Sequence, residues 1–307
     1  MSAQDVENGL RALILGAAAG GGLPQWNCGC DNCIAARVSN SGIVPQSQSS
    51  LAVSVDGVDW LLLNASPDIR TQIADNPQLH PRDRRQTPIR SIILTNGDID
   101  HIAGLLILRE KQAFTVYLTS EIAKVIADNP IFNALDRELV KFQEIGLNET
   151  FEPVLGLSVE LFAVPGKVPL FMEEGEVVTD LEGEQTVGIC LEGGGKRFYH
   201  IPGCAKLTDD LKHRLSNEEL VFFDGTVFDN EEMLKASVGK KTGARMGHMA
   251  MNGPCGSIAG FADLNVKRKI YIHINNTNPI WQPNSPERQK VLNSGWEIAY
   301  DGMEVWL

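Results

Sequence analysis

Three cysteines near the start of the chain are the most concentrated set of metal-ligating side chains. Cys28, Cys30 and Cys33 lie within six residues and are separated by glycine and small polar residues. Thiolates in such a turn can surround one ion, and they suit tetrahedral zinc. Three unrelated reduced thiols are the alternative, but clustered cysteines in an intracellular chain more often bind metal. We predict a structural zinc site whose fourth ligand comes from elsewhere, with His273 and Asn276 as candidates.

A second set of candidate ligands is spread along the chain. Each member falls directly after an expected strand: Asp100 and His101 after 91–95, Asp224 after 220–223, and His273 after 270–272. Loops that follow strands gather at one edge of a sheet, so these four side chains can converge. Taken singly, an aspartate after a strand commonly serves a turn, and a lone histidine is more often a core residue. The prediction of a catalytic metal site therefore depends on the whole set.

Two further residues are candidates for acid–base chemistry. His248, in Gly247-His248-Met249, is expected either to support the metal ligands or to transfer protons; a packed or capping histidine is the alternative. Asp98, close to Asp100, is the second candidate catalytic residue and could also ligate metal. His200 is a weaker candidate.

The elements that must position these residues follow from hydrophobic periodicity and turn signals. We expect strands at 11–15, 91–95, 115–119, 157–164, 220–223 and 270–272, hairpins over 51–63, 186–201 and 296–306, and helices at 102–108 and 121–128. Ser66-Pro67-Asp68 should cap a further helix of about ten residues. The alternation of strands and helices predicts an α/β (α+β) protein in which two sheets pack face to face under helices. Without a repeat or linker, one domain over 1–307 is expected.

Composition restricts the class of partner. The 307 residues are 43% hydrophobic and 21% charged, as in an ordinary globular protein, and carry a net charge of −12. This charge disfavours binding to nucleic acid and fits a small-molecule or peptide substrate better. The first seven residues lack the pattern of a signal peptide, and no apolar run approaches the length of a membrane span. A cytoplasmic protein without a membrane partner is expected.

Several segments resemble known proteins. Asn96-Gly97-Asp98-Ile99-Asp100-His101 resembles the H-x-H-x-D-H metal loop of the metallo-β-lactamase superfamily with its first two histidines replaced. The whole chain resembles the coenzyme PQQ synthesis protein B family of that superfamily. The matching segments are spread over nearly the full length: 21–28 with the cysteines, 64–68, 94–104, 223–226, 246–249 and 272–279. The resemblance implies a metallo-β-lactamase-like αββα sandwich of two mixed sheets, with the active site along one edge.

The resemblance also implies roles for single residues. Asp100 and His101 match the last two residues of the loop, Asp224 the aspartate that bridges two metals in relatives, and His273 the last histidine. Together these four would form one complete site. The other site of a two-metal centre would need histidines at positions 96, 98 and near Pro165-Gly166-Lys167, where this chain has none. A dinuclear centre is therefore not expected.

A single ion held by two histidines and one or two aspartates resembles the centre of non-haem Fe(II) oxygenases, which keeps positions open for O₂ and substrate. The family resemblance accordingly implies an Fe²⁺-dependent hydroxylase, with O₂ and a small tyrosine- and glutamate-derived precursor of pyrroloquinoline quinone (PQQ) as its substrates. Two alternatives stay open: a zinc hydrolase of the superfamily, or an accessory protein that carries PQQ or its precursor to the periplasm. Other proteins of the PQQ pathway and a second copy in a homodimer are the expected protein partners.

Overall fold

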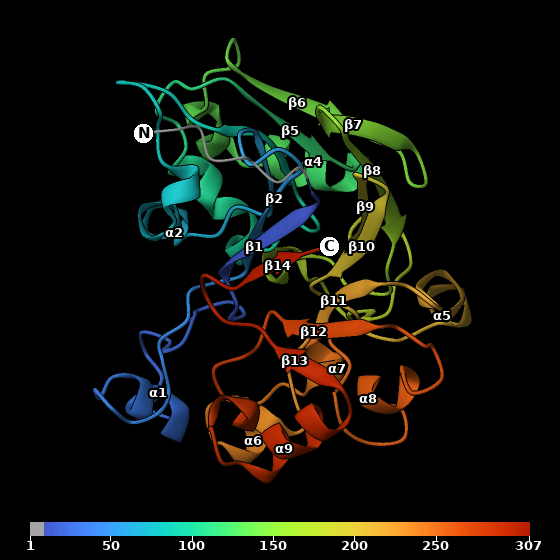
Figure 1. The fold of residues 1–307 in the computed structure, drawn as a ribbon. Helices are drawn as coiled ribbons and strands as arrows, with labels where there is room; N and C mark the ends of the chain where they lie inside the picture. Colours follow the sequence, from blue (N-terminus) through green and yellow to red (C-terminus); the bar gives the residue numbers. More distant parts are fainter. Residues whose placement is uncertain (1–8) are drawn as a thin grey trace.

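The computed structural model describes residues 9–307, and the N-terminal segment searched for a signal peptide lies outside this range. Two seven-stranded sheets face each other, and helices lie on their outer sides (Figure 1). The predicted αββα sandwich is therefore confirmed. Among the described residues, no helix is long and apolar enough to cross a membrane.

The first sheet has the order β14-β1-β2-β3-β4-β5-β6. Its strands are β1 (Arg11–Gly16), β2 (Ser50–Ser54), β3 (Trp60–Leu63), β4 (Ile89–Ile93), β5 (Phe114–Leu118), β6 (Val140–Glu144) and β14 (Glu304–Trp306). The strands from β3 to β6 run parallel, while β14, β1, β2 and β3 pair antiparallel. The chain that leaves β4 carries Asp100 and His101.

The second sheet has the order β13-β12-β11-β10-β9-β8-β7. Its strands are β7 (Thr150–Val154), β8 (Leu157–Ala163), β9 (Val187–Gly193), β10 (Lys196–Ile201), β11 (Leu220–Asp224), β12 (Arg268–Ile272) and β13 (Trp296–Ile298). Here β10 to β13 are parallel, so that the carboxyl ends of β11 and β12 bring Asp224 and His273 to the same edge.

Helices complete the architecture. They are α1 (Asp31–Ala36), α2 (Ile69–Asp75), α3 (Ile99–Ile102), α4 (Ser120–Asp128), α5 (Asp209–Leu215), α6 (Glu232–Lys235), α7 (Gly243–Met246), α8 (Ser257–Gly260) and α9 (Pro286–Asn293). Most are short, and the region around the candidate site is built largely from the turns between them.

The core lies on both faces of the first sheet. Ile14 of β1 belongs to the cluster between the sheets, whereas its neighbours Leu13 and Leu15 belong to the cluster under the outer helices. Successive side chains of a strand point to opposite faces, so a strand buried on both sides reads as a continuous apolar run. For this reason the sequence pattern predicted the strand β1 but did not show which of its side chains face the other sheet and which face the outer helices.

Three local predictions are wrong. The expected hairpin over 296–306 does not form, because β13 pairs with β12 in one sheet and β14 with β1 in the other. Its Asp-Gly turn instead crosses between the sheets, where the Asp301 carboxylate accepts hydrogen bonds from Ala17 N and Ser47 N. The helix expected from residue 102 begins at Ile99 and ends at Ile102. Asp68 does not cap α2, since its Oδ2 accepts from Gln48 N.

Candidate metal centre

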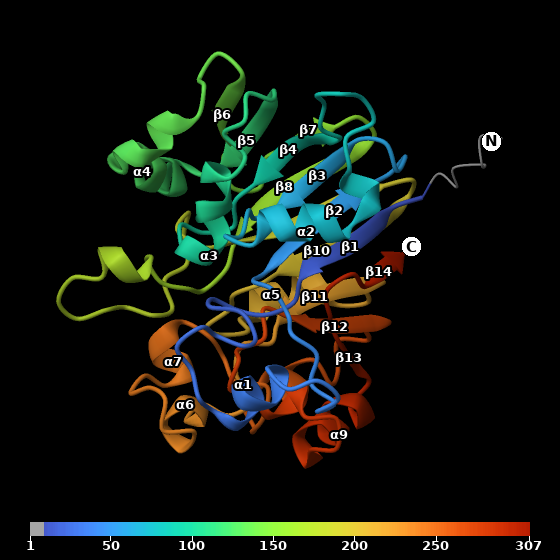
Figure 2. The same ribbon diagram turned by 90° about the vertical axis from the view of Figure 1, so that its left-hand side faces the viewer.

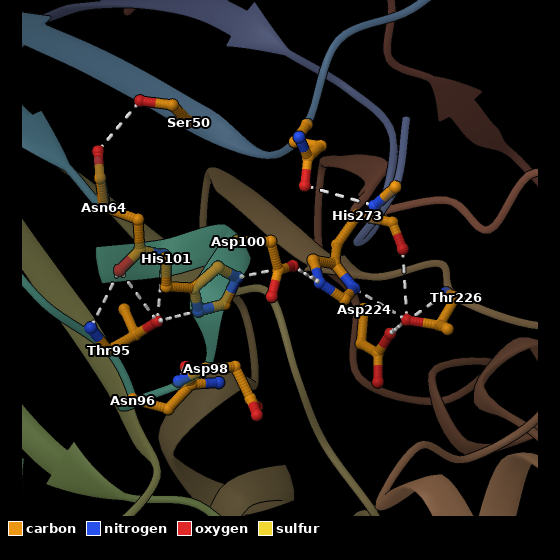
Figure 3. A network of polar contacts seen from close by, with 12 residues as sticks. Ser50, Asn64, Thr95, Asn96, Asp98, Asp100, His101, Asp224, Thr226 and His273 are labelled. Atoms are coloured by element: carbon orange, nitrogen blue, oxygen red, sulfur yellow. Dashed lines mark hydrogen bonds and ion pairs between the residues drawn. The ribbon is translucent and has the colours of Figure 1, made fainter. Parts of the chain in front are cut away.

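Hydrogen bonds among buried polar side chains fix the orientation of the His101 ring (Figure 3). Its Nδ1 lies 3.3 Å from Thr95 Oγ1, at the end of the segment that leaves β4. Asn64 fixes that threonine: Asn64 Oδ1 accepts from Thr95 N at 2.9 Å, and Asn64 Nδ2 donates to Thr95 Oγ1 at 2.9 Å. The imidazole is therefore oriented by groups of the sheet edge, with Nε2 on the side of Asp100.

His273 reaches the same place from the other sheet. Its Nε2 lies 3.2 Å from Asp100 Oδ2, and its Nδ1 lies 2.8 Å from Thr226 Oγ1. The single hydroxyl proton of Thr226 faces two groups that can only accept, Asp224 Oδ1 at 2.6 Å and the His273 carbonyl at 3.0 Å. His273 Nδ1 must then be the donor to Thr226. Nε2 donates to the Asp100 carboxylate, and after loss of that proton its lone pair would be available to a metal ion while Nδ1 keeps its partner.

Asp100, His101 and His273 form a set suited to one ion. Their ligand atoms all lie within 4.8 Å of one another. His101 Nε2 is buried and has no hydrogen-bond partner among the described residues; the nearby Asp100 Oδ2 is 3.7 Å away. Burying a polar atom without a hydrogen-bond partner destabilises the folded state, so we infer that this nitrogen binds a ligand. Two imidazole nitrogens and a carboxylate fit a divalent transition metal there.

The charges of the set agree with this interpretation. Burial lowers the pKa of His101 to about 4, outweighing the carboxylate of Asp100, so the ring is neutral at pH 7. Burial would raise the pKa of Asp100, but His101 and His273 more than offset it and hold that pKa below its ordinary value. Burial would lower the pKa of His273, but the hydrogen bond to Asp100 and the charges of the surrounding carboxylates together outweigh it and raise that pKa. An ionised carboxylate thus shares a buried space with imidazoles, where a proton and a metal cation would compete.

Asp224 and His248 form a neighbouring group that shares His273. Asp224 Oδ2 accepts from Cys204 N at 2.9 Å and lies 2.7 Å from His248 Nδ1. Asp224 Oδ1 accepts from both the backbone N–H and the hydroxyl of Thr226. The ring of His248 stacks on that of His273, with centroids 5.2 Å apart.

The structure therefore divides the four predicted metal ligands. Three of them converge, while Asp224 lies beside His248, the candidate acid–base residue, in the second group of three. Both oxygens of Asp224 already accept hydrogen bonds. Burial would raise the pKa of Asp224, but the adjacent His248 outweighs it and keeps that pKa below its ordinary value. The ligand and acid–base roles of all these residues stay predictions.

Asp98 lies beside the site but belongs to neither group of candidate ligands. Its Oδ1 accepts from Leu170 N at 3.3 Å. Burial, followed by the neighbouring charge of Asp100, raises its pKa. Asn96 Oδ1 accepts from Asp98 N, and Lys167 Nζ pairs with Glu173 at 3.1 Å. In the described part of the chain, positions 96, 98 and 167 thus offer no second set of converging histidines.

The cysteine site lies close by, on the far side of the segment that follows His273. The sulfurs of Cys28, Cys30 and Cys33 gather within 4.8 Å of one another. Asn276 Nδ2 lies 3.2, 3.6 and 3.3 Å from these three sulfurs, respectively. Because amide oxygen and nitrogen are interchangeable by a flip, Asn276 can offer its Oδ1 at the same point. Of the two fourth-ligand candidates, Asn276 is therefore the one placed there, while His273 faces Asp100.

The thiols also lack compensation for their charge. Burial, followed by the neighbouring sulfurs of Cys28 and Cys33, raises the pKa of Cys30 to about 12. Three adjacent thiolates would repel one another unless a cation lay between them. The donor set therefore fits a tetrahedral, thiolate-rich metal site such as that of zinc.

Sequence reasoning missed the threonines that orient both histidines. Thr95 and Thr226 each contact Nδ1 of one ring, which leaves both Nε2 atoms to face Asp100. A signal for Thr226 was present, because it stands two residues after Asp224 in the same turn. The role of Asn64, which is far from Thr95 in sequence, had no such local signal.

The fold and this edge of the sheets define the class of protein. A family model described as the beta-lactamase superfamily domain matches residues 59–274. The chain is 58% identical to Coenzyme PQQ synthesis protein B of Rhizobium meliloti (strain 1021) over 97% of this chain and 98% of that protein. It is 54% identical to the protein of the same name from Methylorubrum extorquens (strain PA1), over 96% and 99% of the two chains. The chain belongs to the coenzyme PQQ synthesis protein B family.

Solved structures agree with this assignment. The crystal structure of Zn(2+)-bound PqqB from Methylobacterium extorquens superimposes with a TM-score of 0.95 and 53% identity, covering 97% of this chain and 100% of that one. A diphosphatase from the PhnP family has a TM-score of 0.69 at 18% identity, covering 97% of each chain. The second likeness shows the fold alone.

Proposed function

We propose that this chain is an iron-dependent hydroxylase that adds oxygen to a tyrosine-derived precursor during the synthesis of PQQ. Membership of the family connects the chain with PQQ synthesis. The observation that carries the finer proposal is the buried set of two imidazoles and one carboxylate, in which His101 Nε2 has no partner among the described residues. This donor set is typical of non-haem Fe(II) oxygenases.

The residues around the set favour one ion over two. Two-metal hydrolysis uses one ion to generate hydroxide and another to stabilise the leaving group. Here Asn96 Oδ1 is engaged by Asp98 N, and the ammonium group of Lys167 is paired with Glu173. An ammonium group cannot ligate a cation, and the amide oxygen of Asn96 would not hold a second zinc ion by itself. A zinc hydrolase is therefore the less favoured function.

Bound at Asp100, His101 and His273, ferrous iron would supply the activation of O₂ that hydroxylation of an aromatic ring requires. The chain's own contribution is orientation: Thr95 and Thr226 contact Nδ1 of the two imidazoles and so direct both Nε2 atoms toward Asp100. Insertion of one oxygen atom into a C–H bond leaves the other to become water, which consumes two electrons from an external reductant.

His248 and Asp224 are proposed to manage a proton beside the reacting centre. The charged carboxylate of Asp224 holds His248 through Nδ1. The remaining nitrogen of the ring is then free to accept or donate a proton. His248 is only partly buried, whereas Asp224 is fully buried, so that the histidine is the member of the pair within reach of a substrate.

We further propose that Cys28, Cys30, Cys33 and Asn276 hold a structural zinc ion. The crystallised relative from Methylobacterium extorquens is itself described as Zn(2+)-bound. Zinc at the cysteine loop would fix the segment 273–276 from one side while His273 serves the other centre. The site would stabilise a region that has few regular elements.

The decisive experiment compares metals and products. Protein purified without oxygen is loaded with iron or with zinc at the Asp-His centre, and isotopically labelled O₂ is added with a reductant and a crosslinked Glu-Tyr dipeptide. We expect labelled oxygen in the product only with iron. Equal activity with zinc and a hydrolysed product would replace the proposal by a hydrolase. Tight binding of PQQ without turnover, both in the presence and in the absence of O₂, would instead favour a carrier protein.

A further inference from the structure

A cluster of cations around one carboxylate lies next to the metal centre. Lys167 Nζ is 3.1 Å and Lys241 Nζ 3.6 Å from the carboxylate of Glu173, and Arg245 donates to both of its oxygens at 3.2 and 2.8 Å. Three cations therefore share one carboxylate in this cluster. Glu174 and Glu176 follow in the chain, but neither forms an ion pair with these cations among the described residues. One carboxylate leaves the cluster able to bind another anion.

The cluster is joined to the candidate centre by direct contacts. The carbonyl of Lys167 accepts from Thr186 Oγ1, and Leu170 N donates to Asp98 Oδ1. The stem of Lys167 packs against Gly247, where an added Cβ would approach its Cγ to 3.1 Å. His248 follows directly. The segment 165–185 thus borders the centre, and Figure 2 shows it projecting between α3 and α7.

Parts of the cluster remain available to a ligand. The side chains of Lys241 and Arg245 are 38% and 39% exposed, whereas those of Lys167 and Glu173 are only 10% and 9% exposed. Hydrogen bonds from Arg245, with those of Lys167, lower the pKa of Glu173 to about 2, so that it stays charged and keeps the arginine fixed. Lys167 and Glu173 therefore serve as a rigid base that presents Lys241 and Arg245 toward solvent.

An apolar surface accompanies these charges. The 3-10 turn Leu170–Met172 leaves three large apolar side chains exposed, Leu170, Phe171 and Met172. Cations beside exposed apolar side chains suit a ligand that carries a carboxylate on an aromatic or aliphatic body. An exposed surface of this kind in a soluble protein commonly marks a binding site.

We propose that Lys241 and Arg245 form a carboxylate-binding subsite at the edge of the metal centre, and that Leu170, Phe171 and Met172 contact the apolar body of the same ligand. The proposal rests on the proposed function, and it adds the residues that would bind one carboxylate and the apolar body of the amino-acid-derived substrate. The subsite would hold one carboxylate while the ring reaches Asp100 and His101. Positioning of this kind lets binding far from the reacting atoms assist the reaction.

The test measures binding rather than turnover. Full-length protein loaded with zinc is titrated calorimetrically with the dipeptide Glu-Tyr and with its uncharged counterpart, Gln-Tyr amide. We expect wild-type protein to bind Glu-Tyr about tenfold more tightly, a preference that Lys241→Ala with Arg245→Ala abolishes. Raising the salt from about 0.05 to about 0.3 M should weaken the preference, because the two cations are partly exposed. Lys235→Ala, on another exposed lysine, is the matched control.

A second variant, expected to change Glu-Tyr affinity in the opposite direction, distinguishes an effect on binding from an effect on folding. Glu173→Gln keeps an amide oxygen that can accept from Arg245 but removes the negative charge that competes for the two exposed cations, so it should tighten Glu-Tyr binding. A purely structural cluster would predict weaker binding in both variants. Equal affinity of wild-type protein for the two peptides, no binding of Glu-Tyr, or an unchanged preference in the double variant would each overturn the subsite. Oxygen uptake by the iron-loaded enzyme tests the proposed function separately, since zinc-loaded protein reports binding whether or not hydroxylation occurs.

Discussion

The cysteine site and the Asp-His site share one segment of the chain but are built in opposite ways. The cysteines come from six consecutive residues, while Asp100 and His273 are 173 residues apart. The segment after β12 supplies both: His273 turns to Asp100, and three residues later Asn276 contacts the sulfurs. One site can thus form from local sequence, whereas the other exists only once the two sheets have packed.

The difference extends to how many positions each site fills. Three sulfurs and an amide could fill all four positions of a tetrahedral ion, and structural zinc sites are closed in this way. The Asp-His set offers three donors, so that an ion there keeps positions for other ligands. An ion with all positions filled by the protein (a closed site) can stabilise the fold but has no position for a substrate. An ion with vacant positions (an open site) can bind reactants. The predictions below test this division.

The largest effect is expected for the open site. His101→Ala removes the nitrogen that lacks a partner, so the Asp-His metal should be lost and hydroxylation should fall at least about 10³-fold, or about 4 kcal/mol in the barrier. Metal per chain by mass spectrometry should drop for iron and stay unchanged for cysteine-bound zinc. His213→Ala, at an exposed position of α5, is the control. A variant that keeps iron and full activity would refute the assignment.

A substitution in the cysteine site should lower the stability of the protein. Cys33→Ser removes a fully buried sulfur from the cluster, so that zinc is lost and the free energy of unfolding falls by on the order of 3 kcal/mol. Zinc content and urea unfolding measure both effects. Cys255→Ser changes an exposed cysteine outside the cluster and should alter neither. Unchanged zinc in Cys33→Ser would show that the cysteines are not its ligands.

A smaller effect should distinguish orientation from ligation. Thr226→Val keeps the shape of the side chain but removes the hydroxyl that contacts His273 Nδ1 and Asp224. We expect the affinity of the Asp-His centre for metal to fall about 10- to 100-fold, with the cysteine site unaffected. Competition with a chelator gives the affinity, and Thr71→Val on exposed α2 is the control. Equal metal affinity in Thr226→Val and Thr71→Val would show that Thr226 does not support the Asp-His centre.

The same contrast explains what the sequence could predict. The cysteine cluster was found from spacing alone, because all three sulfurs belong to one turn. The hairpin of β9 and β10 and the strand ends that carry Asp100, Asp224 and His273 were also readable, since strand periodicity and turn residues are local signals. The αββα sandwich followed from these strands together with the family resemblance.

Two features that the sequence did not show depended on long-range geometry. Asp224 and His273 both leave neighbouring parallel strands, yet Asp224 lies with His248 rather than with His101. Its carboxylate is occupied by Cys204 N and Thr226, contacts that no spacing pattern could reveal. The C-terminal hairpin failed for the same reason: an Asp-Gly pair signals a turn, but the pairing of β14 with β1 decides where the strand goes.

The last prediction concerns the segment that both sites share. Glu232 Oε1 accepts a hydrogen bond from Thr277 Oγ1, and its Oε2 accepts from Phe228 N, so it anchors the residue next to Asn276. Burial raises the pKa of Glu232 from 4.5 to about 7. The folded state therefore holds this proton more tightly than the unfolded state does. This contribution to stability is complete below about pH 4.5 and is lost as the pH rises to about 7.

Glu232→Gln cannot ionise, so its free energy of unfolding should fall less with rising pH than that of the wild type, by on the order of 3 kcal/mol or less. Other groups with raised pKa values, such as Asp301, remain in both proteins. Urea unfolding of zinc-loaded protein at several values between about pH 5 and 7.5 gives both curves. Glu231→Gln changes the exposed neighbouring carboxylate and should follow the wild type. If Glu232→Gln also declines in parallel with the wild type, the buried carboxylate is not the group that couples proton binding to this segment.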